Sequence, residues 1–421
     1  MWSDRISAEQ SRALAAKLRT VLRGEPAPSQ RAPELAIVRP YVLRDPVATV
    51  NYSNGCAEVT GPGGTARVEG GAFDILEAMR EAMRDYRGTV LAGFLSYELA
   101  AELEDLGPLP PADFDFPQMY FGLYERAAAG FDFRRAPVRA GSLTSRPDRR
   151  EFEASVARIV SRIHAGDIFQ TNLCRRIETR LESGSAWDLF CAMRCASPAE
   201  YEAYIPVEEG RAVVSISPEL FLKAENGVVE SRPIKGTRPR GSTPEQDAAL
   251  AAELLASEKD RAELAMIVDV VRNDLGRVCQ TGSVHVAKHA ELMTLPTVHH
   301  SVSTVRGRLC EDAGPAGLLR AAFPAASITG APKIEAMRAA LREEGQWRGP
   351  AMGAIGWIAP DGGMEFSVAI RTAFVSDGVV RYLAGCGITA DSDPAAEFAE
   401  SEHKAAAFVR ALGLRQGENA C

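Results

Sequence analysis

The sequence has little of what a membrane or secreted protein needs. Its 421 residues contain no uncharged apolar stretch of about 18 residues, the length that spans a bilayer. The N-terminus, MWSDRISAEQ, has no basic segment followed by an apolar run, which is the pattern of a signal peptide. We therefore expect a cytoplasmic protein that does not associate with a membrane.

Cysteine pairs of the kind that bind zinc are also lacking. Cys191 and Cys195 lie four residues apart, but no second pair or histidine cluster completes a zinc site. The pattern favours free thiols in a reducing compartment. The eight cysteines are Cys56, Cys174, Cys191, Cys195, Cys279, Cys310, Cys386 and Cys421.

An excess of positive charge is missing as well. The formal net charge is −8, so the surface as a whole is not built to attract nucleic acid or anionic lipid. A small anionic substrate would need a locally positive site or a metal ion. The composition, with 46% hydrophobic and 25% charged residues, is that of an ordinary globular protein.

Hydrophobic periodicity predicts helices and strands in separate groups. Because the strands are adjacent and do not alternate regularly with helices, we predict an α+β fold with mainly antiparallel sheet. An Arg-rich segment, residues 126–150, is interpreted as a linker between an N-terminal region (1–140) and a catalytic region (145–415). The predicted helices are 7–22, 73–86, 152–163, 257–275 and one that begins near Asp393-Pro394; the predicted strands are 35–43, 89–97, 211–216, 220–224, 352–358, 365–375 and 379–384.

Two acidic pairs are candidates for a metal site. Asp260 and Glu263 are three residues apart on one predicted helix, and Glu397 and Glu400 are three apart on another. This spacing puts each pair on one helical face. Four converging carboxylates would suit Mg²⁺, although such pairs are more often solvated surface. Lys404 follows Glu400 on the same face, where it could meet a substrate carboxylate.

Three further segments could hold an anion. SITGAPK (327–333) places small residues before a helix that begins at proline, with free backbone N–H groups, although a plain helix start explains it equally. The glycines of AGCGI (384–388) allow a close approach of backbone to ligand, or simply a tight turn. Arg371 ends an apolar stretch (VAIR) and could clamp a carboxylate or form a structural salt bridge.

One lysine is a candidate nucleophile. Lys235 lies in RPIKGTRPRG between proline and glycine residues, which predicts a rigid turn. Desolvation or a nearby cation would lower its pKa and free the amine for attack. The alternative is an exposed loop lysine.

Taken together, these segments resemble the chorismate-utilising enzymes, which include anthranilate synthase component I, aminodeoxychorismate synthase component I, isochorismate synthase and salicylate synthase. The resemblance covers about 60% of the chain and implies two large packed, mainly antiparallel sheets with helices outside. The matching stretches are GDIFQTNLCRR, SPELFL, RPIKGTRPRG, EKDRAELAMIVDVVRNDLGRV, VHHSVSTVRGRL, FPAASITGAPK, GAIGWI, VAIRT and AGCGITADSDPAAEFAESEHKA, in this order from Gly166 to Ala405.

The resemblance implies roles for individual residues. Glu263 and Glu400 match Mg²⁺ ligands, and Asp260 and Glu397 match their outer carboxylate partners. Glu219 matches the general acid that protonates the departing C4 hydroxyl of chorismate. The positions that match the substrate-binding pocket are Gly236, Thr237, His300, Thr329, Arg371, Gly385, Gly387 and Lys404.

Two positions separate the members of the family. Enzymes that use water as the nucleophile carry a lysine base where this chain has Gln170, which cannot act as a base. Anthranilate synthases typically have alanine at the position of Lys235, whereas PIKGT is similar to aminodeoxychorismate synthase component I. The resemblance therefore implies 4-amino-4-deoxychorismate as the product, for 4-aminobenzoate and folate synthesis.

The resemblance also implies a partner. No stretch of the sequence is typical of a glutaminase, so ammonia would come from a separate glutamine amidotransferase subunit. Two alternatives stay open: an anthranilate synthase component I in which Lys235 is incidental, and a catalytically silent chorismate-binding subunit.

Overall fold

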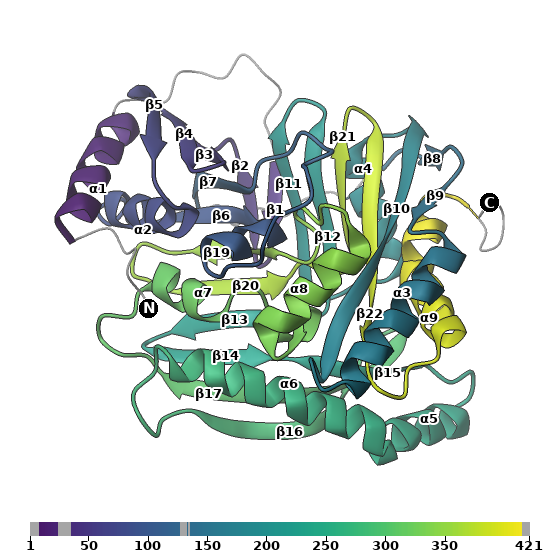
Figure 1. Ribbon diagram of the computed structural model, residues 1–421. Helices are drawn as coiled ribbons and strands as arrows, with labels where there is room; N and C mark the ends of the chain where they lie inside the picture. The colour runs from purple at the N-terminus through teal and green to yellow at the C-terminus, as the bar shows by residue number, and fades with distance from the viewer. Residues whose placement is uncertain (1–7, 24–34, 127–132, 134, 415–421) are drawn as a thin grey trace.

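The computed structural model describes residues 8–23, 35–126, 133 and 135–414. Two large sheets pack against each other, and the helices lie on their outer faces (Figure 1). Paired strands in both sheets run antiparallel. The predicted fold class is confirmed.

The first sheet has ten strands. Its longest pairing joins β10 to β22 over residues 171–180 and 379–388. In spatial order the main strands are β18 (Gly330–Ala331), β10 (Gln170–Ser183), β22 (Val379–Ile388), β21 (Thr372–Ser376), β12 (Arg211–Ser217), β11 (Tyr201–Glu208), β1 (Leu35–Val38) and β2 (Tyr41–Arg44), while β8 (Arg139–Ala140) and β9 (Thr144–Arg146) also pair with β10.

The second sheet has twelve strands. In spatial order they are β15 (Ile234–Pro239), β17 (Val298–Arg308), β14 (Val228–Arg232), β13 (Leu220–Glu225), β20 (Met364–Val368), β19 (Ala354–Ile358), β6 (Thr89–Leu95), β7 (Met119–Glu125), β3 (Ala48–Ser53), β4 (Cys56–Gly61) and β5 (Gly64–Glu69), while β16 (His285–Thr294) pairs with β17.

The helices cover these sheets in groups. Helices α3, α4 and α9 lie over the first sheet, α5 and α6 lie over the β15–β17 end of the second, and α1 packs on α2 (Figure 1). Their bounds are α1 (Ala8–Leu22), α2 (Ala72–Ala82), α3 (Arg149–His164), α4 (Ala186–Ala196), α5 (Pro244–Ala256), α6 (Glu258–Gly276), α7 (Pro315–Ala322), α8 (Lys333–Glu344) and α9 (Pro394–Ala411), with the short helices η1 (Tyr97–Glu102) and η2 (Ala326–Ile328).

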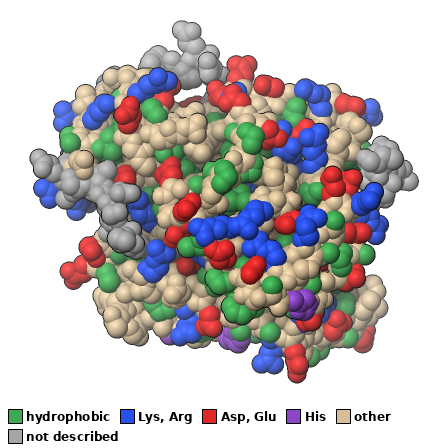
Figure 2. Space-filling model, viewed as in Figure 1, with side chains coloured by type: hydrophobic (Ala, Val, Ile, Leu, Met, Phe, Trp, Pro, Cys, Tyr) green, Lys and Arg blue, Asp and Glu red, His purple; other side chains and the backbone are tan. Residues whose placement is uncertain are grey.

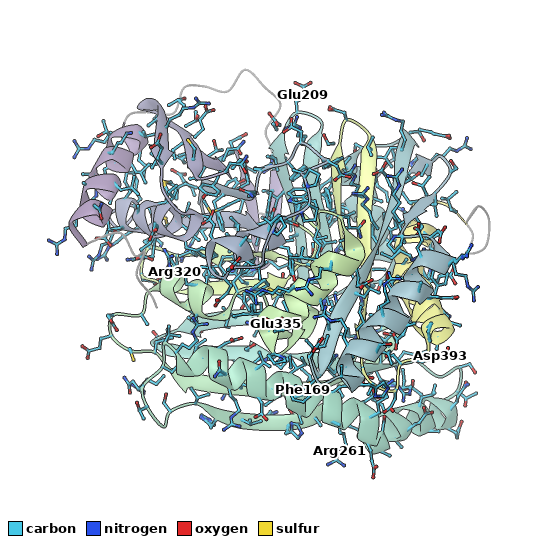
Figure 3. The ribbon with its side chains drawn as sticks, viewed as in Figure 1. Phe169, Glu209, Arg261, Arg320, Glu335 and Asp393 are labelled. Atoms are coloured by element: carbon cyan, nitrogen blue, oxygen red, sulfur yellow. The ribbon has the colours of Figure 1, made fainter. Side chains whose placement is uncertain are left out.

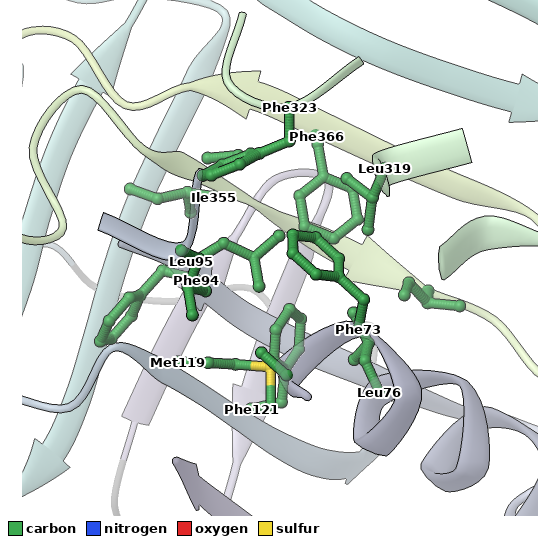
Figure 4. Close-up of a cluster of buried hydrophobic side chains, with 14 of the residues drawn as sticks. Phe73, Leu76, Phe94, Leu95, Met119, Phe121, Leu319, Phe323, Ile355 and Phe366 are labelled. Carbon is green, nitrogen blue, oxygen red and sulfur yellow. The ribbon is translucent and has the colours of Figure 1, made fainter. Parts of the chain in front are cut away.

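A single large hydrophobic cluster runs through both the N-terminal region and the catalytic region. Phe73 of α2 and Phe323 contact each other edge to face, and Phe121 of β7 lies near Phe366 of β20 (Figure 4). All four rings are buried. Such burial contributes about 1.5–3 kcal/mol for each large apolar side chain, so this cluster fixes the sheet on which the site is built.

The two regions predicted from the sequence share both sheets. Strand β1 pairs with β11, and β6 pairs with β19. In the proposed linker, residues 127–132 and 134 lie outside the described residues, whereas β8, β9 and the start of α3 are ordered elements. The boundary near residue 140 stays a prediction.

Most of the predicted elements are confirmed, and their ends have local causes. The Ser257 hydroxyl accepts a hydrogen bond from the Asp260 backbone N–H and begins α6. The Asp393 carboxylate does the same for the Ala396 N–H and begins α9, with Pro394 at the first helical position. These caps contribute about 1 kcal/mol each. Of the predicted helix 7–22, residue 7 lies outside the described residues.

Two predicted strands are wrong in detail. The segment 365–375 is not one strand, because Arg371 has a φ of 51° and separates β20 from β21, which belong to different sheets. The segment 35–43 is not one strand either, because it folds into the hairpin of β1 and β2. In both cases the apolar pattern continues through the break between the two strands, so periodicity alone does not reveal the break.

Within the described residues, no helix is both long and apolar enough to cross a bilayer. Acidic and basic side chains are interspersed over the face in Figure 2, apart from a small group of basic ones near its centre. The described part of that face carries no broad surface of one sign.

Candidate active site

Lys235 lies where the two sheets meet. It belongs to strand β15 of the second sheet and pairs with Ser301 of β17, so the predicted turn is wrong. Its ammonium nitrogen, Nζ, donates to the Ser327 carbonyl at 3.2 Å. A Cβ added to Gly387, on β22 of the first sheet, would lie 3.2 Å from the same Nζ. The side chain therefore points into the junction and not into bulk solvent.

The surroundings of Lys235 disfavour its charge. Burial is the largest effect and lowers the pKa of the amine below its ordinary value. The nearby carboxylate of Glu263 opposes this shift, while the positive charge of Lys404 adds to it. The net direction is toward the free amine.

Glu219 lies beside Lys235 and is buried, with 3% of its surface exposed. Burial raises the pKa of its carboxyl to about 7, against the opposing effects of Ser327 and Lys235. The Ile234 N–H donates to Glu219 Oε1 at 3.4 Å. A carboxyl with this pKa is a proton donor near neutral pH.

The inner pair of carboxylates comes from two helices, as the sequence predicts. Glu263 of α6 and Glu400 of α9 are close enough to affect each other's protonation. Burial raises the pKa of Glu263, whereas the adjacent Lys404 lowers the pKa of Glu400. Lys404 Nζ lies 2.8 Å from Glu400 Oε1 and donates to the Gly385 carbonyl at 2.7 Å. Both side chains of this pair are about half exposed, at 45% and 50%.

The outer pair has different partners. Asp260 accepts from Arg238 Nη2 at 3.2 Å. Glu397 Oε1 accepts from the Ser392 hydroxyl at 2.7 Å, but the other buried oxygen, Oε2, has no hydrogen-bond partner among the described residues. An orphaned buried carboxylate oxygen close to the Glu400 carboxylate fits a hard divalent cation.

The side chains of His300 and Arg371 contact each other. Arg371 Nη2 lies 3.3 Å from His300 Nε2. Because arginine only donates, Nε2 is the acceptor, and Nδ1 carries the proton toward Thr237 Oγ1 at 2.9 Å or the Gly236 carbonyl at 3.3 Å. Burial and then the charge of Arg371 lower the pKa of His300 to about 4, so the ring is neutral.

At each of the three predicted pocket glycines, neighbouring atoms lie too close to leave room for a side chain. Gly236 is a bulge in β15 with a φ of 73°, and an added Cβ would lie 2.8 Å from Leu254 and 3.0 Å from Asp260. Gly385 and Gly387 lie inside β22, not in a tight turn. Added Cβ atoms there would lie 2.6 Å from the side-chain amides of Asn172 and Gln170, respectively.

Hydrogen bonds within the protein hold the segment 327–333 in place. The Thr329 hydroxyl is buried and donates to the Ala325 carbonyl at 3.1 Å. Lys333 Nζ donates to Asp274 Oδ2 and the Ala322 carbonyl, both at 2.7 Å, and to the Pro324 carbonyl at 2.9 Å. All three ammonium donors are used, so this lysine holds the segment and leaves Ser327 facing the site.

Polar atoms gather around Lys235, and sequence reasoning missed Ser301 among them. Gln170 Oε1 and Ser301 Oγ are buried and have no hydrogen-bond partner among the described residues. Phe169, directly before Gln170, is 64% exposed (Figure 3). Only strand register reveals Ser301, because it is the cross-strand neighbour of Lys235. Unsatisfied polar groups around a buried amine indicate a site for a polar ligand.

A family model described as chorismate binding enzyme matches residues 132–410. The chain belongs to this family. The match spans β10 and β15 as well as α6 and α9, which supply Gln170, Lys235, Glu263 and Glu400, so this chorismate-binding enzyme carries its candidate site within the family region.

Relatives of two kinds are similar to this chorismate-binding enzyme. Aminodeoxychorismate synthase component 1 of Klebsiella aerogenes is 40% identical over 338 residues, which cover 74% of each chain. Anthranilate synthase component 1 of Streptomyces coelicolor is 39% identical over 371 residues, 76% of this chain and 72% of that protein. Overall identity therefore does not separate the two activities.

The fold agrees with a solved structure over nearly the whole chain. Anthranilate synthase component I from Streptococcus pneumoniae superposes with a TM-score of 0.76 at 26% identity, covering 97% of this chain and 98% of that one. The architecture expected from the resemblance is thereby confirmed.

Proposed function

We propose that this chorismate-binding enzyme is an aminodeoxychorismate synthase component I, which converts chorismate and ammonia to 4-amino-4-deoxychorismate. The observation that carries the proposal is the partly buried Lys235 amine, whose pKa is lowered and which lies beside a carboxyl with a pKa of about 7. Burial thus favours the nucleophilic form of one group and the acidic form of the other at the same place.

The proposed reaction uses these two groups in two displacements. The free Lys235 amine attacks C2 of the ring, the C4 hydroxyl leaves as water with the proton of Glu219, and the double bond shifts. Ammonia then attacks C4, the double bond shifts back, and the lysine, whose nitrogen has kept both of its protons, leaves as the neutral amine. The new C4 ammonium group gives one proton to the Glu219 carboxylate, which restores the acid. The Ser327 carbonyl, which accepts from Nζ at 3.2 Å, holds the amine while its lone pair faces the ring.

Substrate carboxylates have cationic partners available. Arg371 is partly buried, and no carboxylate of the described residues forms an ion pair with it. A partly buried guanidinium without an acidic partner is available to a ligand that supplies the anion, which supports a role in binding chorismate. His300, neutral and held by Thr237, orients the guanidinium through Nε2.

The metal expectation is part of the same proposal. Glu263 and Glu400 would hold Mg²⁺, with Glu397 as an outer partner whose Oε2 is otherwise unpaired. When bound, Mg²⁺ would supply positive charge for the ring carboxylate and offset the charge of these carboxylates. Asp260 is held by Arg238 and would stay outside the first set of ligands.

Ammonia is proposed to come from a separate glutamine amidotransferase subunit in the cytoplasm, with the product used for 4-aminobenzoate and folate synthesis. The relatives that carry the name component 1 support a multi-subunit enzyme. The second candidate is an anthranilate synthase component I, which the 39% identical relative favours.

The deciding experiment is mass spectrometry of the product from chorismate, ammonium and Mg²⁺. We expect 4-amino-4-deoxychorismate and a loss of at least about 100-fold in its rate of formation with Lys235→Ala, because the nucleophile is removed. The control is Lys223→Ala, a half-exposed lysine of β13 paired with Glu365, which should retain the rate. Anthranilate and pyruvate as the products, or an unchanged rate with Lys235→Ala, would refute the proposal.

A further inference from the structure

Cys386 lies between the two pocket glycines of β22, next to the start of α9. Its side chain is fully buried, and Sγ donates to the Glu397 carbonyl at 3.3 Å. It packs in a small cluster that includes Phe398. The proposed reaction uses no thiol, so the contact of this cysteine with the metal-binding helix has no role in the proposed function.

The thiol shares a small space with two carboxylates. Ligand atoms of Cys386, Glu397 and Glu400 all lie within 4.8 Å of one another. In a tetrahedral zinc site with bonds of 2.0–2.3 Å, neighbouring ligand atoms are separated by roughly 3.3–3.8 Å. A closing movement of about 1 Å would therefore bring three protein ligands around one ion.

A second observation points to a cation at the same place. Glu397 is only 6% exposed, and its Oε2 atom is buried without a hydrogen-bond partner in the described structure. Leaving such an oxygen unpaired destabilises the folded protein, and a bound cation would offset this cost. Mg²⁺ takes oxygen ligands, so it would satisfy this oxygen but would not use the adjacent sulfur.

We propose that Cys386, Glu397 and Glu400 form a sulfur-containing ligand set that overlaps the proposed Mg²⁺ site and captures a thiophilic divalent cation such as Zn²⁺. Binding forms a metal–sulfur bond and releases the thiol proton to solvent, with no change of oxidation state. Because Glu400 belongs to both ligand sets, Zn²⁺ and Mg²⁺ exclude each other. Zn²⁺ therefore inhibits the enzyme by displacing Mg²⁺.

The test is a titration of the full chain with Cd²⁺ in the absence of Mg²⁺ and chorismate, read from the ultraviolet thiolate-to-cadmium charge-transfer band. In wild type, the band should include a component that saturates at one equivalent of Cd²⁺, and this component should be absent from Cys386→Ala. The affinity for Cd²⁺ should fall at least about tenfold in the variant. Cys195→Ala removes an exposed cysteine and should keep this equivalent. Added Mg²⁺ should weaken Cd²⁺ binding to wild type, whereas Mg²⁺ alone should give no band.

Glu397→Gln provides a second variant that keeps the thiol, and it should also weaken Cd²⁺ binding. Equal charge-transfer bands in wild type and Cys386→Ala would overturn the inference, as would Cd²⁺ binding indifferent to Glu397→Gln. The competition with Mg²⁺ rests on the metal site of the proposed function, but the titration contains no chorismate. A negative cadmium titration therefore leaves the product assignment unaffected. Likewise, a product other than 4-amino-4-deoxychorismate leaves the measured binding of Cd²⁺ unaffected.

Discussion

At the scale of single residues, burial acts on the two reacting groups in a complementary way. It disfavours the charged form of each, so it raises the pKa of the Glu219 carboxyl and lowers that of the Lys235 amine. The attraction between a carboxylate and an ammonium opposes both shifts, but it is the smaller effect on each residue. Both shifts favour the protonated acid and the free amine, the pair that the proposed displacement needs.

The pKa of Glu219 predicts how activity depends on pH. The acid must be protonated, so the rate should fall as pH rises through about 7. Glu219→Gln keeps the shape but cannot donate a proton as an acid. We expect it to lower kcat by about 100-fold or more and to remove this alkaline limb.

The measurement is the pH profile of kcat for both enzymes, with chorismate at saturation. A variant that loses rate but keeps the limb near pH 7 would show that another group is the acid. Glu225→Gln, an exposed glutamate that ends the neighbouring strand β13, is the control and should leave the profile unchanged.

At the scale of elements, a glycine without a side chain leaves room where strands of the two sheets come together. Gly387 of β22 leaves the space that the ends of Lys235 and Gln170 occupy. The bulge at Gly236 shifts the register of β15 against β17 at the same point. The reacting amine is therefore positioned by strand geometry, not by the rigid turn that the Pro-Gly neighbourhood suggested.

Gly387→Ala should uncouple activity from stability. Its Cβ would lie 2.6 Å from Gln170 Nε2 and 3.2 Å from Lys235 Nζ, and both are side-chain ends that can move. We expect a stability loss near the lower end of about 1–3 kcal/mol. A displacement of Lys235 by about 1 Å should lower kcat by roughly 100-fold.

Urea unfolding and steady-state kinetics of the same preparation measure the two effects. Gly317→Ala is the matched control, since its added Cβ in α7 meets no atom within 4 Å. A Gly387→Ala enzyme with unchanged kcat would mean that the amine tolerates displacement.

At the scale of the whole molecule, a buried ion pair ties the N-terminal region to the site. Arg348 Nη2 lies 2.6 Å from Glu344 Oε1, with 1% and 0% of the two side chains exposed. The same guanidinium donates to the Asn172 carbonyl at 2.8 Å and lies over the Tyr97 ring at 4.3 Å. Glu98 accepts from the Arg348 N–H at 2.7 Å. Elements η1, α8 and β10 therefore meet at one arginine.

Arg348→Met should destabilise the fold by about 3–5 kcal/mol, because it leaves the Glu344 carboxylate buried without its cation. The readout is the free energy of unfolding in urea. Arg272→Met removes an exposed partner of Asp269 and should leave that value nearly unchanged. A small effect at Arg348 would mean that the carboxyl of Glu344 becomes neutral and tolerates burial alone.

The sequence by itself determined the local features and the family. Local sequence indicates the caps of α6 and α9, the acidic pairs on these two helices and Lys235 as a candidate nucleophile. Each of these features depends on neighbours within a few residues. The ordered motifs indicated the chorismate-binding family and its fold, and the family match and the solved relative agree.

Only the tertiary structure decided which of these features share a pocket. The unpaired oxygens of Gln170 and Ser301 come from two distant segments, and their lack of partners depends on strand register. The break at Arg371 between β20 and β21 and the strand setting of Lys235 likewise follow from contacts between the two sheets. Burial sets the pKa values that the proposed chemistry uses, and burial is a property of the packed molecule, because it depends on atoms far away in the chain.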